Sequence, residues 1–80
     1  SKFLSVYPNP ANDVLNINLD AAAGSIATYQ LVDVTGRLLL NGNAENNAFS
    51  LDVDGVNPGL YFVNITLKDG SVATKRVVIQ

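Results

Sequence analysis

Short runs of alternating apolar and polar residues constrain this chain more than any other feature of its sequence. In residues 14–19, three aliphatic side chains alternate with two asparagines, and residues 60–67 continue the same pattern over a longer stretch. Successive side chains of a β-strand point to opposite faces, so this alternation produces a strand with one apolar and one polar face. Because helical periodicity is scarce, the sequence predicts a protein built of half-buried strands.

Glycine, proline and asparagine divide these runs into segments of strand length. Strands are expected at residues 3–7, 14–19, 26–34, 37–40, 49–53, 60–67 and 71–79. Thr35 and Gly36 predict a tight hairpin in which Gly36 adopts a positive φ angle. Residues 8–10 predict a turn that ends an edge strand, and residues 68–70 predict a second hairpin. Residues 41–47 predict a polar loop, and residues 21–25 a turn too short to become a helix.

Short strands with one apolar face each bury those faces best when two sheets pack against each other. The predicted fold is therefore all-β: a small antiparallel β-sandwich, immunoglobulin-like, of about seven strands. A five- or six-stranded barrel is the alternative. Eighty residues suit a single domain, residues 1–80, with a modest core. No apolar run approaches the roughly 18 residues of a membrane span. The start at Ser1, without Met or an apolar leader, predicts a domain cut from a longer protein.

The amino-acid composition argues against catalysis. The chain has no Cys, His or Met, and only 15% of its residues are charged. Disulfides, thiolate metal sites and the usual histidine general base are therefore excluded, and no enzyme activity, cofactor or metal is expected. Asp52 and Asp54 form a close carboxylate pair, but the glycine that follows makes turn chemistry the preferred interpretation over calcium binding.

Two further patterns could indicate sugar chemistry. Residues 64–66, Asn-Ile-Thr, fit the acceptor pattern for N-glycosylation, yet they fall in the middle of an expected strand. Tyr7, Tyr29 and Tyr61 could line a carbohydrate surface, but they belong to separate strands, and tyrosines in cores and corners are commoner. Structural roles are therefore the preferred interpretation of both patterns.

Positive charge gathers near the end of this chain, whose net charge is −2. Residues 1–67 carry two basic and six acidic side chains, whereas residues 68–80 carry three basic and one acidic. So weak a positive surplus does not suit nucleic-acid binding. The adjacent pair Lys75 and Arg76 is instead a candidate for recognition by a protein partner.

The last expected strand combines this basic pair with apolar residues. Val72, Val78 and their apolar neighbours are expected to fold the strand, while Lys75 and Arg76 are the residues that a partner would contact. As the final strand of a small sandwich, it could lie at a sheet edge and pair with a strand of another chain. The alternative is that the pair only keeps an exposed strand face solvated.

Four stretches, taken in order, point to one known family. They are YPNPANDVLNI at residues 7–17, VDVTGRLL at residues 32–39, VNPGLYFVNI at residues 56–65 and TKRVVIQ at residues 74–80. Together they resemble the type A C-terminal sorting domain of the type IX secretion system, also called the Por secretion system C-terminal sorting domain. Each motif is short, but the ordered set covers nearly the whole chain, from about Ser5 onward.

The resemblance implies a sorting signal without catalytic activity. Such domains follow an N-terminal cargo domain and are recognised by an outer-membrane shuttle barrel and a sortase-like peptidase. The peptidase removes the signal, and many cargoes are then attached to surface lipopolysaccharide. The cargo would pass through the periplasm to the cell surface or the medium. A sandwich module that binds carbohydrate or a cell-surface ligand is the alternative function, and a structural spacer is a third.

The resemblance also singles out particular residues. Recognition by the secretion machinery is expected to involve Lys75, Arg76, Val77 and Val78. Structural roles are expected for the other motif positions, which are Pro8, Pro10, Gly36, Arg37, Gly59 and Tyr61. For the two prolines and the two glycines the expected reason is backbone geometry. The prolines would fix an extended segment before the first long strand, and Gly59 would let the Tyr61 ring pack closely.

Overall fold

The computed structural model describes residues 3–80, and Ser1 and Lys2 lie outside the described residues. Within that range the strands are β1 (Leu4–Tyr7), β2 (Val14–Leu19), β3 (Ile26–Asp33), β4 (Leu38–Asn43), β5 (Ala48–Asp52), β6 (Gly59–Leu67) and β7 (Val72–Ile79). A single 3-10 turn, η1 (Ala21–Ala23), separates β2 from β3, and the Asp20 carboxylate accepts a hydrogen bond from the Ala22 amide at its start. No helix in residues 3–80 is long and apolar enough to cross a membrane.

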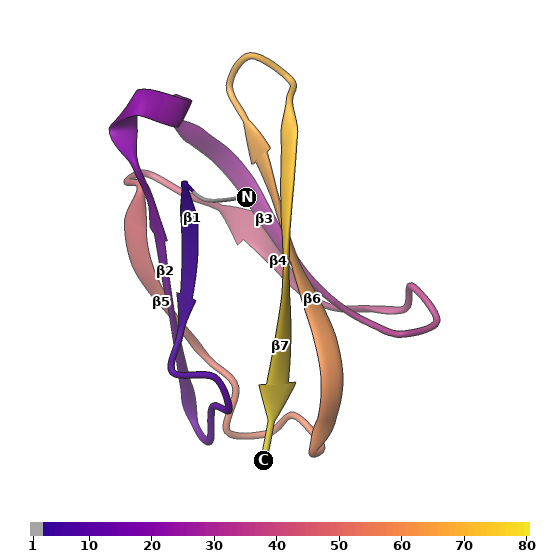
Figure 1. Ribbon diagram of the computed structural model, residues 1–80. Coiled ribbons are helices and arrows are strands. Elements are labelled where there is room, and N and C mark those ends of the chain that lie inside the picture. The colour runs from indigo at the N-terminus through magenta and orange to yellow at the C-terminus, as the bar shows by residue number, and fades with distance from the viewer. Residues whose placement is uncertain (1–2) are drawn as a thin grey trace.

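The strands form two antiparallel sheets that face each other (Figure 1). One sheet has the order β1-β2-β5 and the other the order β4-β3-β6-β7. The chain passes from one sheet to the other after β2, β4 and β5. This arrangement is that of an immunoglobulin-like sandwich, so the predicted fold class is confirmed. Because the two sheets are separate, the barrel alternative is wrong.

The core lies between the two sheets, on the apolar face of the strands. Buried side chains alternate with more exposed ones along β2 and β6, as the sequence pattern predicts. The buried core consists of Leu4, Val6, Ala11, Leu15, Ile17, Leu19, Ile26, Leu31, Leu51, Val53, Tyr61, Val63, Ile65, Leu67, Val77 and Ile79. Among the described residues no charged residue is buried, so burial of apolar surface holds the two sheets together.

Strand β4 is longer than the sequence suggests. The composition predicts a loop over residues 41–47, but residues 41–43 continue β4 and pair with residues 28–30 of β3. Pairing with a central strand thus overrides the weak strand preference of asparagine and glycine. The bounds of the other six strands agree with the sequence prediction to within one residue at each end.

The two open sides of the sandwich are closed in different ways. On one side the edge strands β1 and β7 contact each other (Figure 1). On the other side, the ring of Tyr29 from β3 packs against the ring of Phe49 from β5, with centroids 5.2 Å apart. The Tyr29 hydroxyl lies over Gly42 of β4, where an added Cβ would come within 2.6 Å of it. Gly42 therefore provides the space that this aromatic contact needs.

This close approach makes Gly42 sensitive to substitution. The Gly42→Ala change would push the Tyr29 ring away from Phe49, and we expect it to lower the free energy of unfolding by about 1–3 kcal/mol. Gly55→Ala is the matched control, because a Cβ there meets no atom of the described residues within 4 Å. Urea unfolding followed by tyrosine fluorescence measures both variants. Equal stability of the two would contradict the packing role of Gly42.

Candidate recognition site

The end of β7 is hydrogen-bonded to the loop that follows β1, and we call this set of bonds the fastening of β7. The side-chain amide of Asn9 donates to the Arg76 carbonyl at 3.3 Å, and its side-chain oxygen accepts from the Val78 amide at 3.0 Å. The Ala11 amide donates to the Val78 carbonyl at 2.9 Å, and the Ala11 carbonyl accepts from the Gln80 amide at 2.8 Å. This loop therefore occupies the outer edge of β7 along its C-terminal half.

Pro8 and Pro10 flank Asn9 in this loop, and the peptide bond before each of them is cis. The predicted turn after the edge strand β1 is confirmed, whereas the expectation of an extended segment is wrong, because residues 8–10 bend and carry the chain across to β7. This detour leaves Ala11 fully buried. Proline has no backbone N–H group, so neither proline leaves a hydrogen-bond donor unpaired beside the strand edge.

The loop that is hydrogen-bonded to β7 limits where β7 can pair with a strand of another chain. β7 is an edge strand of the four-stranded sheet, as expected. Its backbone from Arg76 to Gln80 is nevertheless hydrogen-bonded to Asn9 and Ala11, so that half is closed to strand pairing. A partner of this half of β7 would have to contact side chains.

The basic pair is divided between the two faces of β7. Lys75 lies opposite Val63, a buried inner-face residue of β6, whereas Arg76 lies opposite Phe62 on the outer face. Lys75 is half-buried and Arg76 is exposed. Since neighbours in a strand point in opposite directions, the two side chains form no common basic patch. An inward-pointing charge such as Lys75 also disfavours pairing at a sheet edge.

The valines of β7 also depart from expectation. The sequence suggests that Val72, Val78 and their apolar neighbours fold the strand, which is wrong for Val72 and Val78, because 64% and 38% of their surfaces are exposed. Val77 and Ile79 are buried in their place, since the register puts Val77 opposite the buried Tyr61. Of the two valines expected to be recognised, Val78 is accessible and Val77 is enclosed in the core.

The VDVTGRLL motif forms a hairpin organised by Asp33. One carboxylate oxygen of Asp33 accepts hydrogen bonds from the Thr35 hydroxyl at 2.6 Å, the Thr35 amide at 2.8 Å and the Arg37 amide at 3.0 Å. These bonds, that of the Thr35 hydroxyl foremost, hold the pKa of Asp33 below its ordinary value of 3.8, against the opposing effect of desolvation. Gly36 has a φ angle of +85°, which confirms the predicted positive value.

The turn between β6 and β7 uses the same chemistry. The Asp69 carboxylate accepts hydrogen bonds from the Ser71 hydroxyl at 2.6 Å and the Ser71 amide at 2.9 Å. The hydroxyl bond and then the amide bond lower the pKa of Asp69 below 3.8. Gly70 supplies a positive φ angle of +89°. Both turns thus combine an aspartate, a hydroxyl two residues later and a glycine beside it.

The VNPGLYFVNI motif forms a corner at the start of β6. The Tyr61 hydroxyl donates to the Asn57 carbonyl four residues upstream, while the Tyr61 ring is buried. A tyrosine with this position and bond is a feature of immunoglobulin-like sandwiches. An added Cβ at Gly59 would meet the Tyr61 ring at 3.5 Å, which is an ordinary contact. The ring therefore does not require a glycine at position 59.

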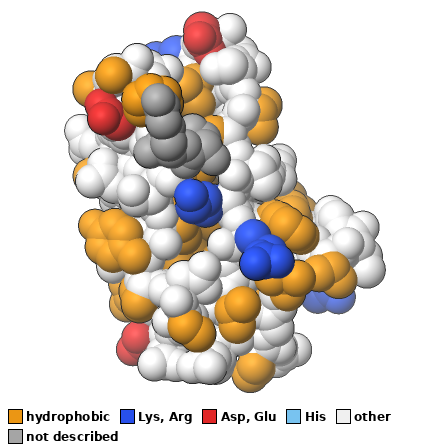
Figure 2. All heavy atoms as spheres, viewed as in Figure 1, with side chains coloured by type: hydrophobic (Ala, Val, Ile, Leu, Met, Phe, Trp, Pro, Cys, Tyr) orange, Lys and Arg blue, Asp and Glu red, His pale blue; other side chains and the backbone are white. Residues whose placement is uncertain are grey.

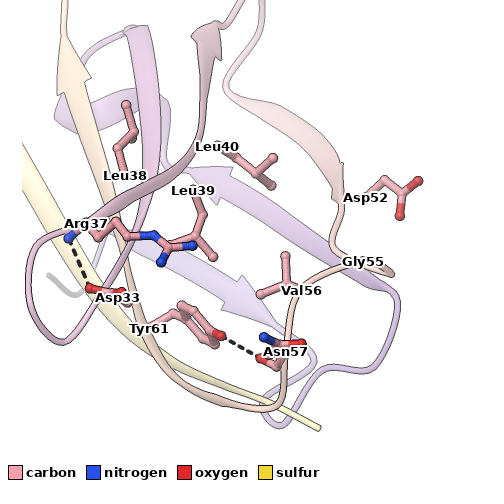
Figure 3. A pocket seen from close by; sticks show the side chains of 10 residues that line it. All are labelled: Asp33, Arg37, Leu38, Leu39, Leu40, Asp52, Gly55, Val56, Asn57 and Tyr61. Atoms are coloured by element: carbon pink, nitrogen blue, oxygen red, sulfur yellow. Dashed lines mark hydrogen bonds between the residues drawn. The ribbon is translucent and has the colours of Figure 1, made fainter.

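A hollow of about 530 Å³ opens between β4 and the loop after β5 (Figure 3). It is lined by Asp33, Arg37, Leu38, Leu39, Leu40, Asp52, Gly55, Val56, Asn57 and Tyr61. The Arg37 side chain extends from the hairpin toward it. Its two carboxylates have turn partners, since Asp33 accepts from its own hairpin and Asp52 accepts from the Asp54 amide at 3.0 Å. The hollow therefore brings no free acid and base together.

The remaining candidates have structural partners as well. Tyr61 is buried, Tyr29 packs against an aromatic ring between the sheets, and Tyr7 is exposed at the end of β1. The three tyrosines therefore share no carbohydrate surface. Asn64 lies within β6, where its side-chain oxygen accepts from the Thr74 hydroxyl at 2.8 Å. Across residues 3–80 no cluster of three or more acidic side chains could hold a metal ion.

Three asparagines that sequence reasoning did not single out join separate segments. Besides Asn9, Asn47 accepts from the Ile26 amide and donates to the Gly24 carbonyl, and Asn16 connects β1 with β5. The asparagine side chain can do this because it both donates and accepts, as the backbone does. The proline on either side of Asn9 is a sequence signal for such a role, but it does not reveal the distant partner.

These features define a small immunoglobulin-like sandwich whose last strand is fastened by a proline-flanked asparagine and carries one exposed basic side chain on its outer face. A family model described as the secretion system C-terminal sorting domain matches residues 5–80. The chain therefore belongs to this family of type IX secretion sorting domains, and the resemblance seen in the four motifs is confirmed.

Three individual proteins are similar to this chain. Ulvan lyase NLR42 of Nonlabens ulvanivorans is 26% identical over 77 residues, which are 95% of this chain and 14% of that protein. PorZ, described as an essential bacterial surface component of the type-IX secretion system of Porphyromonas gingivalis, matches with a TM-score of 0.80 at 23% identity over 99% of this chain and 12% of its own. CopC from Methylosinus trichosporium OB3b matches with a TM-score of 0.50 at 14% identity, over 95% of this chain and 90% of its own.

The two structural matches show the fold alone, at identities of 23% and 14%. The chain spans only a small part of the lyase and of PorZ, 14% and 12% of their lengths. It therefore corresponds to one domain of much larger proteins in these two cases.

The fastening of β7 predicts the effect of changing Asn9. Asn9→Ala removes two hydrogen bonds to the backbone of β7, and we expect the free energy of unfolding to fall by about 1–2 kcal/mol. Asn9→Asp should not rescue it, because the carboxylate would place an acceptor against the Arg76 carbonyl. Asn46→Ala, in an exposed loop, is the control. Thermal unfolding checks the order of stabilities, and an Asn9→Ala variant as stable as the control would contradict it.

The aspartate turns predict a response to acid. Because the pKa values of Asp33 and Asp69 are lower in the folded chain than in the unfolded one, their stabilising effect is complete above pH 3.8 and is lost as the pH falls through the folded values. We expect Asp33→Asn and Asp69→Asn to lower stability at pH 7 and to lose less stability on acidification than the unchanged chain. Urea titrations at pH 7 and at about pH 3 test this.

Asp54→Asn is the control for these variants, because the backbone amide of Asp54, rather than its carboxylate, makes the bond in its turn. Acid sensitivity that is the same in Asp33→Asn and in the control would show that the hairpin bonds do not favour the ionised form.

Proposed function

We propose that residues 1–80 are a sorting signal that directs a cargo protein across the outer membrane through the type IX secretion system. The observation that carries this proposal is the family match over residues 5–80, which takes in nearly the entire sandwich. A signal of this extent is a folded surface rather than a short peptide. The cargo would be an N-terminal domain of the same protein, consistent with the small share of the lyase and of PorZ that this chain spans.

The partners in this proposal are an outer-membrane shuttle barrel and a sortase-like peptidase. The barrel would hold the folded sandwich while the peptidase hydrolyses the peptide bond between cargo and signal. Peptidases need extended, unpaired backbone, which the strands of this sandwich do not provide, so cleavage is expected on the N-terminal side of β1. The cargo would then be released or attached to surface lipopolysaccharide.

We infer that the sandwich itself has no catalytic role. The carboxylates of Asp33, Asp52 and Asp69 accept hydrogen bonds from amides of their own turns, which is a structural use. The sequence supplies neither His nor Cys as a base or nucleophile. Any reaction of the whole protein would therefore take place in its cargo domain.

A reporter fusion tests the proposed function. Residues 1–80 are placed after a fluorescent protein that carries an ordinary export signal, in a bacterium with type IX machinery. We expect the reporter outside the outer membrane. The double change Lys75→Ala and Arg76→Ala should reduce export about tenfold or more, as loss of a recognition residue commonly does. Lys68→Ala, which removes one positive charge at the exposed turn before β7, is the control for loss of basic charge elsewhere and should export normally.

The location of the unchanged fusion decides the proposal. Reporter that stays in the periplasm would refute a sorting function. Thermal unfolding of the purified fusions accompanies the assay, so that a variant that fails to fold is not mistaken for one that is not recognised.

A further inference from the structure

The outer face of the four-stranded sheet is divided into a polar and an apolar half. Residues directly opposite each other on neighbouring strands share a face, so the strand register gives the rows of side chains across it. Two rows contain Thr28, Gln30, Asn41, Asn43, Asn64, Thr66, Val72 and Thr74, and only Val72 among them is apolar. The other two rows contain Leu38, Val32, Phe62 and Arg76, and then Leu60 and Val78.

We call the second set the outer patch: Val32, Leu38, Leu60, Phe62, Arg76 and Val78. Val32 and Phe62 are half-buried, and the other four are exposed. Figure 2 shows hydrophobic side chains gathered around a basic one on the side of β6 and the 33–37 hairpin. The solvent face of an antiparallel sheet is normally polar, so a group of five adjacent apolar side chains is unusual and typical of an interaction surface.

Charge distinguishes the outer patch from the rest of the molecule. Arg76 is the single charged residue of this face, and no carboxylate lies on it among the described residues. The chain as a whole carries a net charge of −2, so its acidic groups lie elsewhere. A partner that covers the patch would bury the Arg76 guanidinium, which is unfavourable unless the partner brings an opposite charge.

The loop after β1 holds two residues of the outer patch in place. Asn9 bonds to the Arg76 carbonyl and to the Val78 amide, which are the two contributions of β7 to the patch. The backbone of these residues is thereby fixed before a partner arrives, which reduces the entropy lost on binding. The fastening of β7 and the outer patch are therefore parts of one arrangement.

We propose that the outer patch docks on a protein surface that presents a carboxylate within an apolar surround. The inference rests on the proposed function, in which that surface belongs to the export machinery. It assigns Arg76 and Val78 to recognition and removes Lys75 and Val77, which lie on the inner face of β7. The patch contains an aromatic ring, Phe62, and beside it on the edge strand an arginine, Arg76, and both residue types are enriched in protein interfaces.

Charge complementarity favours this partner over two others. Two copies of the chain docked through the same face would bury two arginines and no carboxylate. An anionic membrane attracts clusters of basic residues, whereas this face has one basic residue on a chain of net negative charge. A protein surface with its own carboxylate satisfies both the apolar area and the arginine.

Single substitutions in the reporter fusion test the outer patch. Val78→Thr and Arg76→Gln should each reduce export about tenfold, and Arg76→Glu should reduce it further, because it sets two negative charges against each other. Val72→Thr is the matched control: it lies on the same strand and face, is more exposed than Val78, and sits in the polar half. It should export within about twofold of the unchanged fusion. Midpoints of thermal unfolding confirm that all four variants fold.

The outcomes separate this inference from the function on which it rests. If the unchanged fusion is not exported, the sorting function fails. If it is exported and the Val78 and Arg76 variants are exported equally well, only the outer patch is refuted. Sedimentation of the purified domain that shows a dimer lost in Val78→Thr would assign the patch to a second copy. Flotation with phosphatidylglycerol vesicles that depends on Arg76 would assign it to a membrane.

Discussion

Two hydrogen bonds from one asparagine to the backbone of the last strand determine how this sandwich is closed. Asn9 reaches Arg76 and Val78 across almost the whole length of the sequence, and Ala11 extends the contact as a backbone bridge. Without them β7 would present an unpaired edge, which is a hazard for any small sheet protein. With them, the strand that contributes Arg76 and Val78 to the outer patch is held from both sides, by β6 and by the loop. The sheet edge is thus closed and the side chains beside it are left accessible.

The polar residues of this domain serve mainly to connect segments. Asn16 and Asn47 join strands and loops, while Asp33 and Asp69 close the two hairpins with hydroxyl and amide donors. In a chain of this size the apolar core alone gives modest stability, so side chains that replace missing backbone partners matter more than in a larger domain.

Much of the fold follows from local patterns in the sequence. The alternation of apolar and polar residues predicted the seven strands and, in β2 and β6, the side chains that face the core. The glycine at position 36 predicted a turn there. The extension of β4 could not be predicted, because pairing with β3 decides it. The candidate site was less predictable. Because Lys75 and Arg76 are neighbours in the sequence, they were expected to act together. Strand register decides which of the two side chains lies on the inner face of the sheet and which on the outer face, and a shift of one residue would exchange their positions.

The contact between Asn9 and Val78 joins residues 69 positions apart, so it forms only after β7 exists. A chain that stops before residue 72 lacks β7, and with it the core residues Val77 and Ile79 and the patch residues Arg76 and Val78. Contacts of such long sequence separation cost loop-closure entropy, which slows folding. The bonds that close this side of the sandwich therefore also fix the backbone of the two β7 residues proposed for recognition, so this part of the surface is present only when β7 has folded onto the rest of the domain.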